Sequence, residues 1–85
     1  MQEESDIIVK RLRWRCRRGI KEVEIPLQRF FEQHYVALDA EHQALFQQLL
    51  TCDDVDLFEW LTRRSESPDA KINYMVGYLL RTLAA

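Results

Sequence analysis

The chain has 85 residues, of which 47% are hydrophobic and 31% charged, and its net charge at pH 7 is −2. This length predicts one small domain over residues 1–85, and the hydrophobic content is too high for a disordered protein. No apolar run approaches the ~18 residues of a membrane helix, and residues 1–10 lack the apolar core of a signal peptide. We therefore expect a cytoplasmic protein that is not inserted in a membrane.

Apolar residues recur with helical spacing through nearly the whole chain. Leu27, Phe30 and Phe31, for example, follow the i, i+3, i+4 pattern of one buried helix face. No segment alternates as a half-buried strand would. The fold class predicted from this pattern is all-α, a small five-helix bundle. The expected helices span residues 5–17, 25–37, 40–51, 54–64 and 68–83.

Residues that start helices lie between these apolar runs. Pro26 suits the first position of the second helix, and Pro68, after Ser67 as N-cap, suits the first position of the fifth. Asp39 and Asp53 are the expected N-caps of the third and fourth helices.

The first expected helix has an unusual distribution of side chains. Ile8, Leu12 and Cys16 form one narrow apolar stripe, while Trp14 lies on a different side together with Arg11. Two interpretations of Trp14 stay open. It is either buried between two neighbouring helices or part of an aromatic and arginine surface for a partner, a composition that interface hot spots favour.

Positive charge is concentrated where this helix ends. Between Lys10 and Lys21 the chain carries seven basic residues and no acidic one. Gly19 is expected to end the helix as a left-handed C′ residue, and arginines in the last turn complement the helix dipole. An Arg18–Glu22 salt bridge across the bend would use one more charge. These structural roles do not account for all seven charges, so a binding role is predicted as well.

Several function classes fit the sequence poorly. From residue 25 onward there are nine acids against five bases and the pI is about 5.6, which argues against specific nucleic-acid binding. Two glycines could not build a phosphate-binding loop, and no serine or cysteine has a partner at a catalytic spacing, so no catalytic residue is predicted. Cys16, Cys52, His34 and His42 lack zinc-site spacing, so we expect reduced thiols and no metal.

A resemblance to a known family rests on two stretches. Residues 18–22 read Arg-Gly-Ile-Lys-Glu, the RGxxE motif, within the wider pattern Arg-Trp-Arg-Cys-Arg-Arg-Gly of residues 13–19. Residues 49–61 then read Leu-Leu-Thr-Cys-Asp-Asp-Val-Asp-Leu-Phe-Glu-Trp-Leu. Over residues 11–61 the chain resembles the SdhE-type FAD assembly factors of succinate dehydrogenase, whose mitochondrial relatives are called succinate dehydrogenase assembly factor 2.

The resemblance implies a five-helix bundle and a chaperone-like function rather than an enzyme. Such a factor binds the flavoprotein subunit of succinate dehydrogenase, and in some bacteria that of fumarate reductase, and promotes its covalent flavinylation. FAD then belongs to the client, which supplies its own histidine nucleophile, and the factor binds no cofactor by itself. The partner-binding residues carried over by position are Arg18, Gly19 and Glu22 of the motif, flanked by Arg17, Trp14 and Arg11.

Two departures from the family pattern qualify the resemblance. Residues 22–24 read Glu-Val-Glu where many members have Glu-Leu-Asp, and the segment after Leu61 matches only loosely. The alternative function is a small helical regulatory or antitoxin-like binding protein that contacts nucleic acid through the basic first helix.

Overall fold

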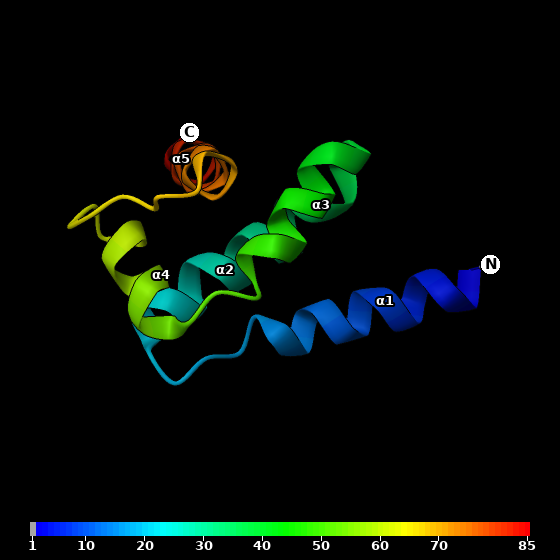
Figure 1. Cartoon of the computed structure of the whole chain (residues 1–85). Helices are drawn as coiled ribbons and strands as arrows, with labels where there is room; N and C mark the ends of the chain where they lie inside the picture. Colours follow the sequence, from blue (N-terminus) through cyan, green and yellow to red (C-terminus); the bar gives the residue numbers. More distant parts are fainter. Residues whose placement is uncertain (1) are drawn as a thin grey trace.

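The computed structural model describes residues 2–85, with side chains from Asp6 onward. It contains five α-helices and one short 3-10 helix, η1, and no strand within these residues, which confirms the predicted all-α class (Figure 1). In chain order the elements are α1 (Gln2–Arg15), α2 (Lys21–His34), η1 (Tyr35–Ala37), α3 (Ala40–Leu49), α4 (Asp54–Leu61) and α5 (Ala70–Ala84).

Helix α2 is central to the packing, because it lies against both α4 and α5, while α3 packs along α5. The core forms where these four helices meet. Phe30 of α2 and Phe46 of α3 are fully buried, with their ring centroids 5.4 Å apart. Burial of such apolar surface is the main stabilising contribution in a domain of this size.

Helix α1 lies along one side of the bundle, and its N-terminal half extends away from the other helices (Figure 1). Leu12 and Cys16 are buried, as the apolar stripe predicts. Ile8, the third member of that stripe, is 49% exposed, so the prediction is wrong for this residue. The reason is that the first turns of α1 project past the elements that could cover them.

Two of the expected helix starts are wrong. Helix α2 begins at Lys21, so Pro26 lies inside the helix rather than at its first position. The cost is one backbone hydrogen bond, since proline has no N–H to donate to the carbonyl four residues earlier. Helix α5 begins at Ala70 rather than at residue 68, and its N-cap is Asp69, whose carboxylate accepts from the Lys71 and Ile72 N–H groups.

The predicted N-cap residues of α3 and α4 lie at the N-cap positions in the structure. Asp39 caps α3 and accepts a hydrogen bond of 2.8 Å from the His42 N–H. Asp53 occupies the N-cap position of α4 with extended backbone angles, but its side chain makes no capping hydrogen bond.

Helix α4 ends in an arrangement that usually contains glycine. The Arg64 N–H donates to the Glu59 carbonyl at 2.9 Å and the Arg63 N–H to the Trp60 carbonyl at 3.2 Å, which is the Schellman pattern. Arg63 therefore adopts a left-handed backbone, with φ of 63°, at a cost of about 1 kcal/mol relative to glycine.

Among the helices of residues 2–85, none combines the length and the apolarity that crossing a bilayer would need.

Candidate functional site

The five residues between α1 and α2, Cys16 to Ile20, bring the motif residues together. Helix α1 ends at Arg15, and the Cys16 N–H still donates to the Leu12 carbonyl at 3.1 Å. No glycine in residues 2–85 has a positive φ, so the prediction of a left-handed Gly19 is wrong. Gly19 lies four residues beyond the end of the helix, too far along the chain to cap it.

The Arg18 side chain points into the fold, and it is only 12% exposed. Its guanidinium donates to two carbonyls in the α3–α4 connection, that of Leu50 at 2.5 Å and that of Cys52 at 3.1 Å. It also pairs with Asp54 at 3.1 Å and donates to the Arg15 carbonyl at 2.9 Å. Carbonyls at helix ends have no intrahelical donor, so Arg18 satisfies groups that would otherwise be left without a partner.

Two carboxylates hold the backbone of the same turn. The Arg18 N–H donates to Glu24 Oε1 at 2.6 Å, and the Gly19 N–H donates to Asp54 Oδ2 at 3.3 Å. The bond from the Arg18 N–H, with a smaller contribution from Lys21, lowers the pKa of Glu24 below its ordinary value of 4.5. We call Arg18, Glu24 and Asp54 the inner bracket, because together they tie α1 to α2 and α4.

The prediction of an Arg18–Glu22 salt bridge is wrong. Within the described residues Arg18 pairs with Asp54, and Glu22 is exposed and takes part in no salt bridge. The reason is helical geometry, because residues two apart are rotated by about 200° around the axis. Glu24 faces the turn, so Glu22 on the same helix faces solvent.

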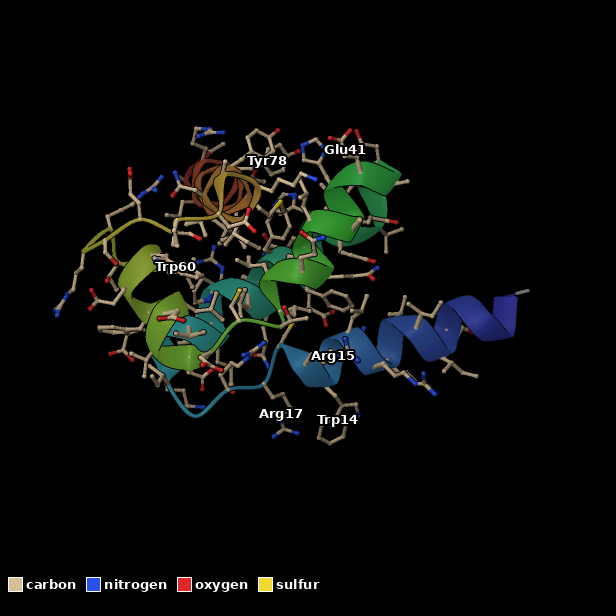
Figure 2. All side chains as sticks on the ribbon, viewed as in Figure 1. Trp14, Arg15, Arg17, Glu41, Trp60 and Tyr78 are labelled. Carbon is tan, nitrogen blue, oxygen red and sulfur yellow. The ribbon has the colours of Figure 1, made fainter. Side chains whose placement is uncertain are left out.

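A different set of side chains points outward from the same turn. Trp14 is 67% exposed, and the Arg17 guanidinium lies over its ring, 4.9 Å from the centroid. Both side chains project away from the bundle in Figure 2. Arg11 is exposed one helical turn before Trp14, on the same side of α1. Of the two interpretations of Trp14, burial between helices is wrong. We call Arg11, Trp14 and Arg17 the outer face.

Gly19 lies in the turn before α2 and Glu22 in the first turn of α2, and both are exposed. A Cβ atom added to Gly19 would meet only Asp54 Oδ2, at 3.9 Å, which is an ordinary contact distance. The fold itself therefore does not require glycine at this position. The absence of a side chain matters here only to a molecule that approaches the turn from outside.

Several residues that the sequence analysis did not predict as site residues also line this site. A hollow of about 370 Å³ beside the outer face is lined by Arg13, Trp14, Arg17, Glu24 and Gln28. Arg13 also pairs with Glu32 of α2 at 2.7 Å. The contact between Asp54 and Arg18 joins residues 36 positions apart, and no spacing rule in the sequence could have paired them.

Two cysteines lie at or near this turn, Cys16 buried and Cys52 half-buried. The Cys16 thiol, next to the turn, has its pKa raised to about 12 by burial, so it is neutral at physiological pH. Burial also raises the pKa of Cys52. Within residues 6–85, no three histidine, cysteine or acidic side chains come together as a metal site would need.

Comparison with known proteins gives this geometry a family context. Residues 10–83 match the model of a family described as flavinator of succinate dehydrogenase. The FAD assembly factor of Pseudomonas aeruginosa is 42% identical over 80 residues, which cover 94% of this chain and 93% of that protein. The FAD assembly factor of Idiomarina loihiensis is 39% identical over 71 residues, covering 84% and 79%, and that of a Serratia species is 41% identical over 69 residues, covering 81% and 78%. The chain therefore belongs to the family of succinate dehydrogenase flavinators, which are assembly factors and not enzymes.

Proposed function

We propose that this chain binds the flavoprotein subunit of succinate dehydrogenase and promotes the covalent attachment of FAD to it. The flavoprotein subunit of fumarate reductase is a second client of the same kind. The docking surface consists of the outer face together with Gly19 and Glu22, and Arg18 holds the turn in the shape that presents them.

The observation that carries this proposal is the exposure of Trp14. A tryptophan that is 67% exposed and covered by an arginine, with both side chains directed to solvent, gives little to the stability of the free chain. Tryptophan and arginine are the residues most enriched among interface hot spots. Gly19 lies a few residues away and adds a place where a partner's surface can approach the backbone closely.

The charge of this surface suits a dinucleotide-loaded client. Arg11 and Arg17 are exposed on the outer face, although the whole chain carries a net charge of −2. A local positive field would steer the factor toward an anionic region such as the surroundings of the FAD pyrophosphate in the client. FAD stays bound to the client in this proposal, and this chain supplies shape and positive charge.

A reconstitution with purified proteins tests the proposal. The apo flavoprotein subunit is mixed with FAD and with this chain, and covalent flavin is read as fluorescence of the subunit band in a denaturing gel. Addition of the chain should raise the rate of covalent flavin formation. Trp14→Ala should lower that rate about tenfold or more, the size expected when a hot-spot residue is lost.

A matched control separates docking from general surface effects. Val55 is 70% exposed on α4, outside the outer face, so Val55→Ala should leave flavinylation unchanged. The same assay with the fumarate reductase subunit tests the second client. If the wild-type chain neither accelerates flavinylation nor co-purifies with either subunit, the proposed function is wrong. The proposal places this activity in the cytoplasm, which fractionation of cells that express a tagged chain would test.

A further inference from the structure

A second arrangement of arginines lies at the other end of α4 from the inner bracket. Arg81 Nη1 and Arg63 Nη2 lie 3.0 Å and 3.5 Å from the point where a Cβ atom on Gly77 would be. The two nitrogens are therefore no more than about 6.5 Å apart. One guanidinium comes from the second residue after α4 and the other from the last turn of α5, so positive charge from two parts of the chain lies over one buried glycine.

These two guanidinium groups have no acidic partner within residues 6–85. None of the salt bridges in that range includes Arg63 or Arg81. Asp69, the acid that precedes α5, uses its carboxylate to cap that helix. Arg64, the residue after Arg63, has its guanidinium over the Phe58 ring instead, 5.3 Å from the centroid. Among the described side chains, no acid therefore forms a salt bridge with either of these two neighbouring cations.

The residue types at the two backbone positions are the reverse of what local stability favours. Arg63 occupies the left-handed C′ position, where glycine is the residue with least strain. Gly77 lies inside α5, where alanine would stabilise the helix. An alanine at position 77 would place its methyl group against Arg81 Nη1 at 3.0 Å. Both choices cost local stability, and the glycine at position 77 leaves room for the Arg81 guanidinium close above it.

We propose that Arg63 and Arg81 form a binding site for a phosphate-type oxyanion, either inorganic phosphate or a phosphate ester. Charge-assisted hydrogen bonds from arginine are about 2.7–2.9 Å long, so two donors no more than about 6.5 Å apart can reach two oxygens of one tetrahedral anion. A carboxylate is fully matched by a single guanidinium fork, whereas two guanidinium groups suit a dianion with three peripheral oxygens.

This site is separate from the docking surface. Arg18 contacts Asp54 at the first residue of α4, and Arg63 follows the last turn of that helix. Eight residues of helix, at about 1.5 Å each, put roughly 12 Å between the two ends. The inference therefore does not depend on the proposed function, and phosphate binding by the free chain tests it alone.

The experiment is a titration of the full-length chain with inorganic phosphate at low ionic strength, followed by backbone amide NMR shifts. Saturable shifts should centre on residues 63 and 77 to 81, and acetate should bind at least about tenfold more weakly. Arg81→Gln should weaken phosphate binding about tenfold, since it removes a charged donor. Arg63→Gly should do the same while raising the melting temperature, because it removes the left-handed strain.

Two further variants make the result decisive. Gly77→Ala should raise the melting temperature through better helix propensity and yet weaken phosphate binding, because the methyl group displaces the Arg81 guanidinium. Arg64→Gln removes the same charge one residue away and should leave binding unchanged. Equal weakening in Arg64→Gln and Arg63→Gly would reduce the site to diffuse attraction and overturn the proposal. Three other results would overturn it as well. The wild type could show no saturable binding of phosphate, or it could bind acetate as tightly as phosphate. Alternatively, Arg63→Gly and Arg81→Gln could both leave phosphate binding intact.

Discussion

Arg17 and Arg18 are adjacent in the sequence and belong to two different regions of the molecule. Arg18 is turned into the inner bracket, where backbone carbonyls and Asp54 accept its hydrogen bonds. Arg17 is turned out to the outer face, where its guanidinium lies over the exposed ring of Trp14. The difference shows that one run of basic charge performs two tasks, since one arginine shapes the turn and the other is presented by it.

Arg18→Ala should have the largest effect, and it should act on folding. The substitution removes the donors to the Leu50 and Cys52 carbonyls and leaves Asp54 without its cation. We expect a loss of about 2–4 kcal/mol in the free energy of unfolding, measured by urea denaturation. This is a large fraction of the stability of a small domain. A loss below about 0.5 kcal/mol, the level of an ordinary surface substitution, would contradict the inner bracket.

Gly19→Arg should show the opposite balance, with flavinylation lost and folding unchanged. Gly19 has no positive φ, and a Cβ atom there would meet Asp54 Oδ2 at an ordinary contact distance of 3.9 Å. The free energy of unfolding should therefore change by no more than about 0.5 kcal/mol. A long side chain at the point of close approach would separate the docking surfaces and should abolish covalent flavin formation in the client subunit.

Gly19→Ala is the matched control for this variant. A methyl group adds little volume at an exposed position, so this variant should retain most of its flavinylation activity. If Gly19→Arg supports flavinylation at the wild-type rate, the turn is not part of the docking surface. If it unfolds the chain, the open geometry described at Gly19 is wrong.

Most of the helical architecture could be predicted from the sequence, because helical periodicity is a local property. The buried residues of α2, such as Leu27, Phe30 and Phe31, follow directly from it. The start of α2 could not be predicted, since Pro26 signals a first turn and tertiary packing extends the helix five residues before it. The N-cap of α5 could not be predicted either. Ser67 and Asp69 are both residue types that favour the N-cap position, and the sequence alone does not show which of them caps the helix.

The candidate site was predictable in its location and not in its internal pairing. The basic run, Gly19 and Trp14 indicated the turn, because they lie close together in the chain. Leu50, Cys52 and Asp54, which accept from the Arg18 guanidinium, lie more than 30 residues away along the chain, so only folding brings them together. The predicted Arg18–Glu22 pair failed for a simpler reason, since Glu22 faces solvent while Glu24, two residues further on, faces the turn.

Glu22→Ala should have a smaller effect than Gly19→Arg, and it should affect binding alone. Glu22 is exposed and makes no salt bridge within the described residues, so thermal melts of the variant should match the wild type. Loss of a charge at the rim of an interface changes association rate and salt dependence more than it changes packing. We expect flavinylation to slow about threefold to tenfold at low salt, with the difference shrinking as salt is added. A lower melting temperature with normal flavinylation would make Glu22 a structural residue instead.

The smallest expected effect concerns Glu24 and the pH dependence of stability. The pKa of this carboxyl is held below 4.5 by the Arg18 N–H and by Lys21, so the folded state favours its charged form. The stabilising contribution is therefore present above pH 4.5 and is lost as the pH falls through the lowered pKa of the folded state.

Glu24→Gln removes this titration, so the stability difference between wild type and variant should be constant near pH 7 and should shrink toward zero as the solution is acidified below 4.5. The pKa of Asp39 is also lowered, by hydrogen bonds from His42, so the acid limb of the wild-type curve has more than one source. Subtracting the curve of the variant from that of the wild type isolates Glu24, because Asp39 is present in both proteins. Urea denaturation at a series of pH values measures both curves. A difference that stays constant down to the lowest pH at which the chain still folds would show that the 2.6 Å bond from the Arg18 N–H does not depend on the charge of Glu24.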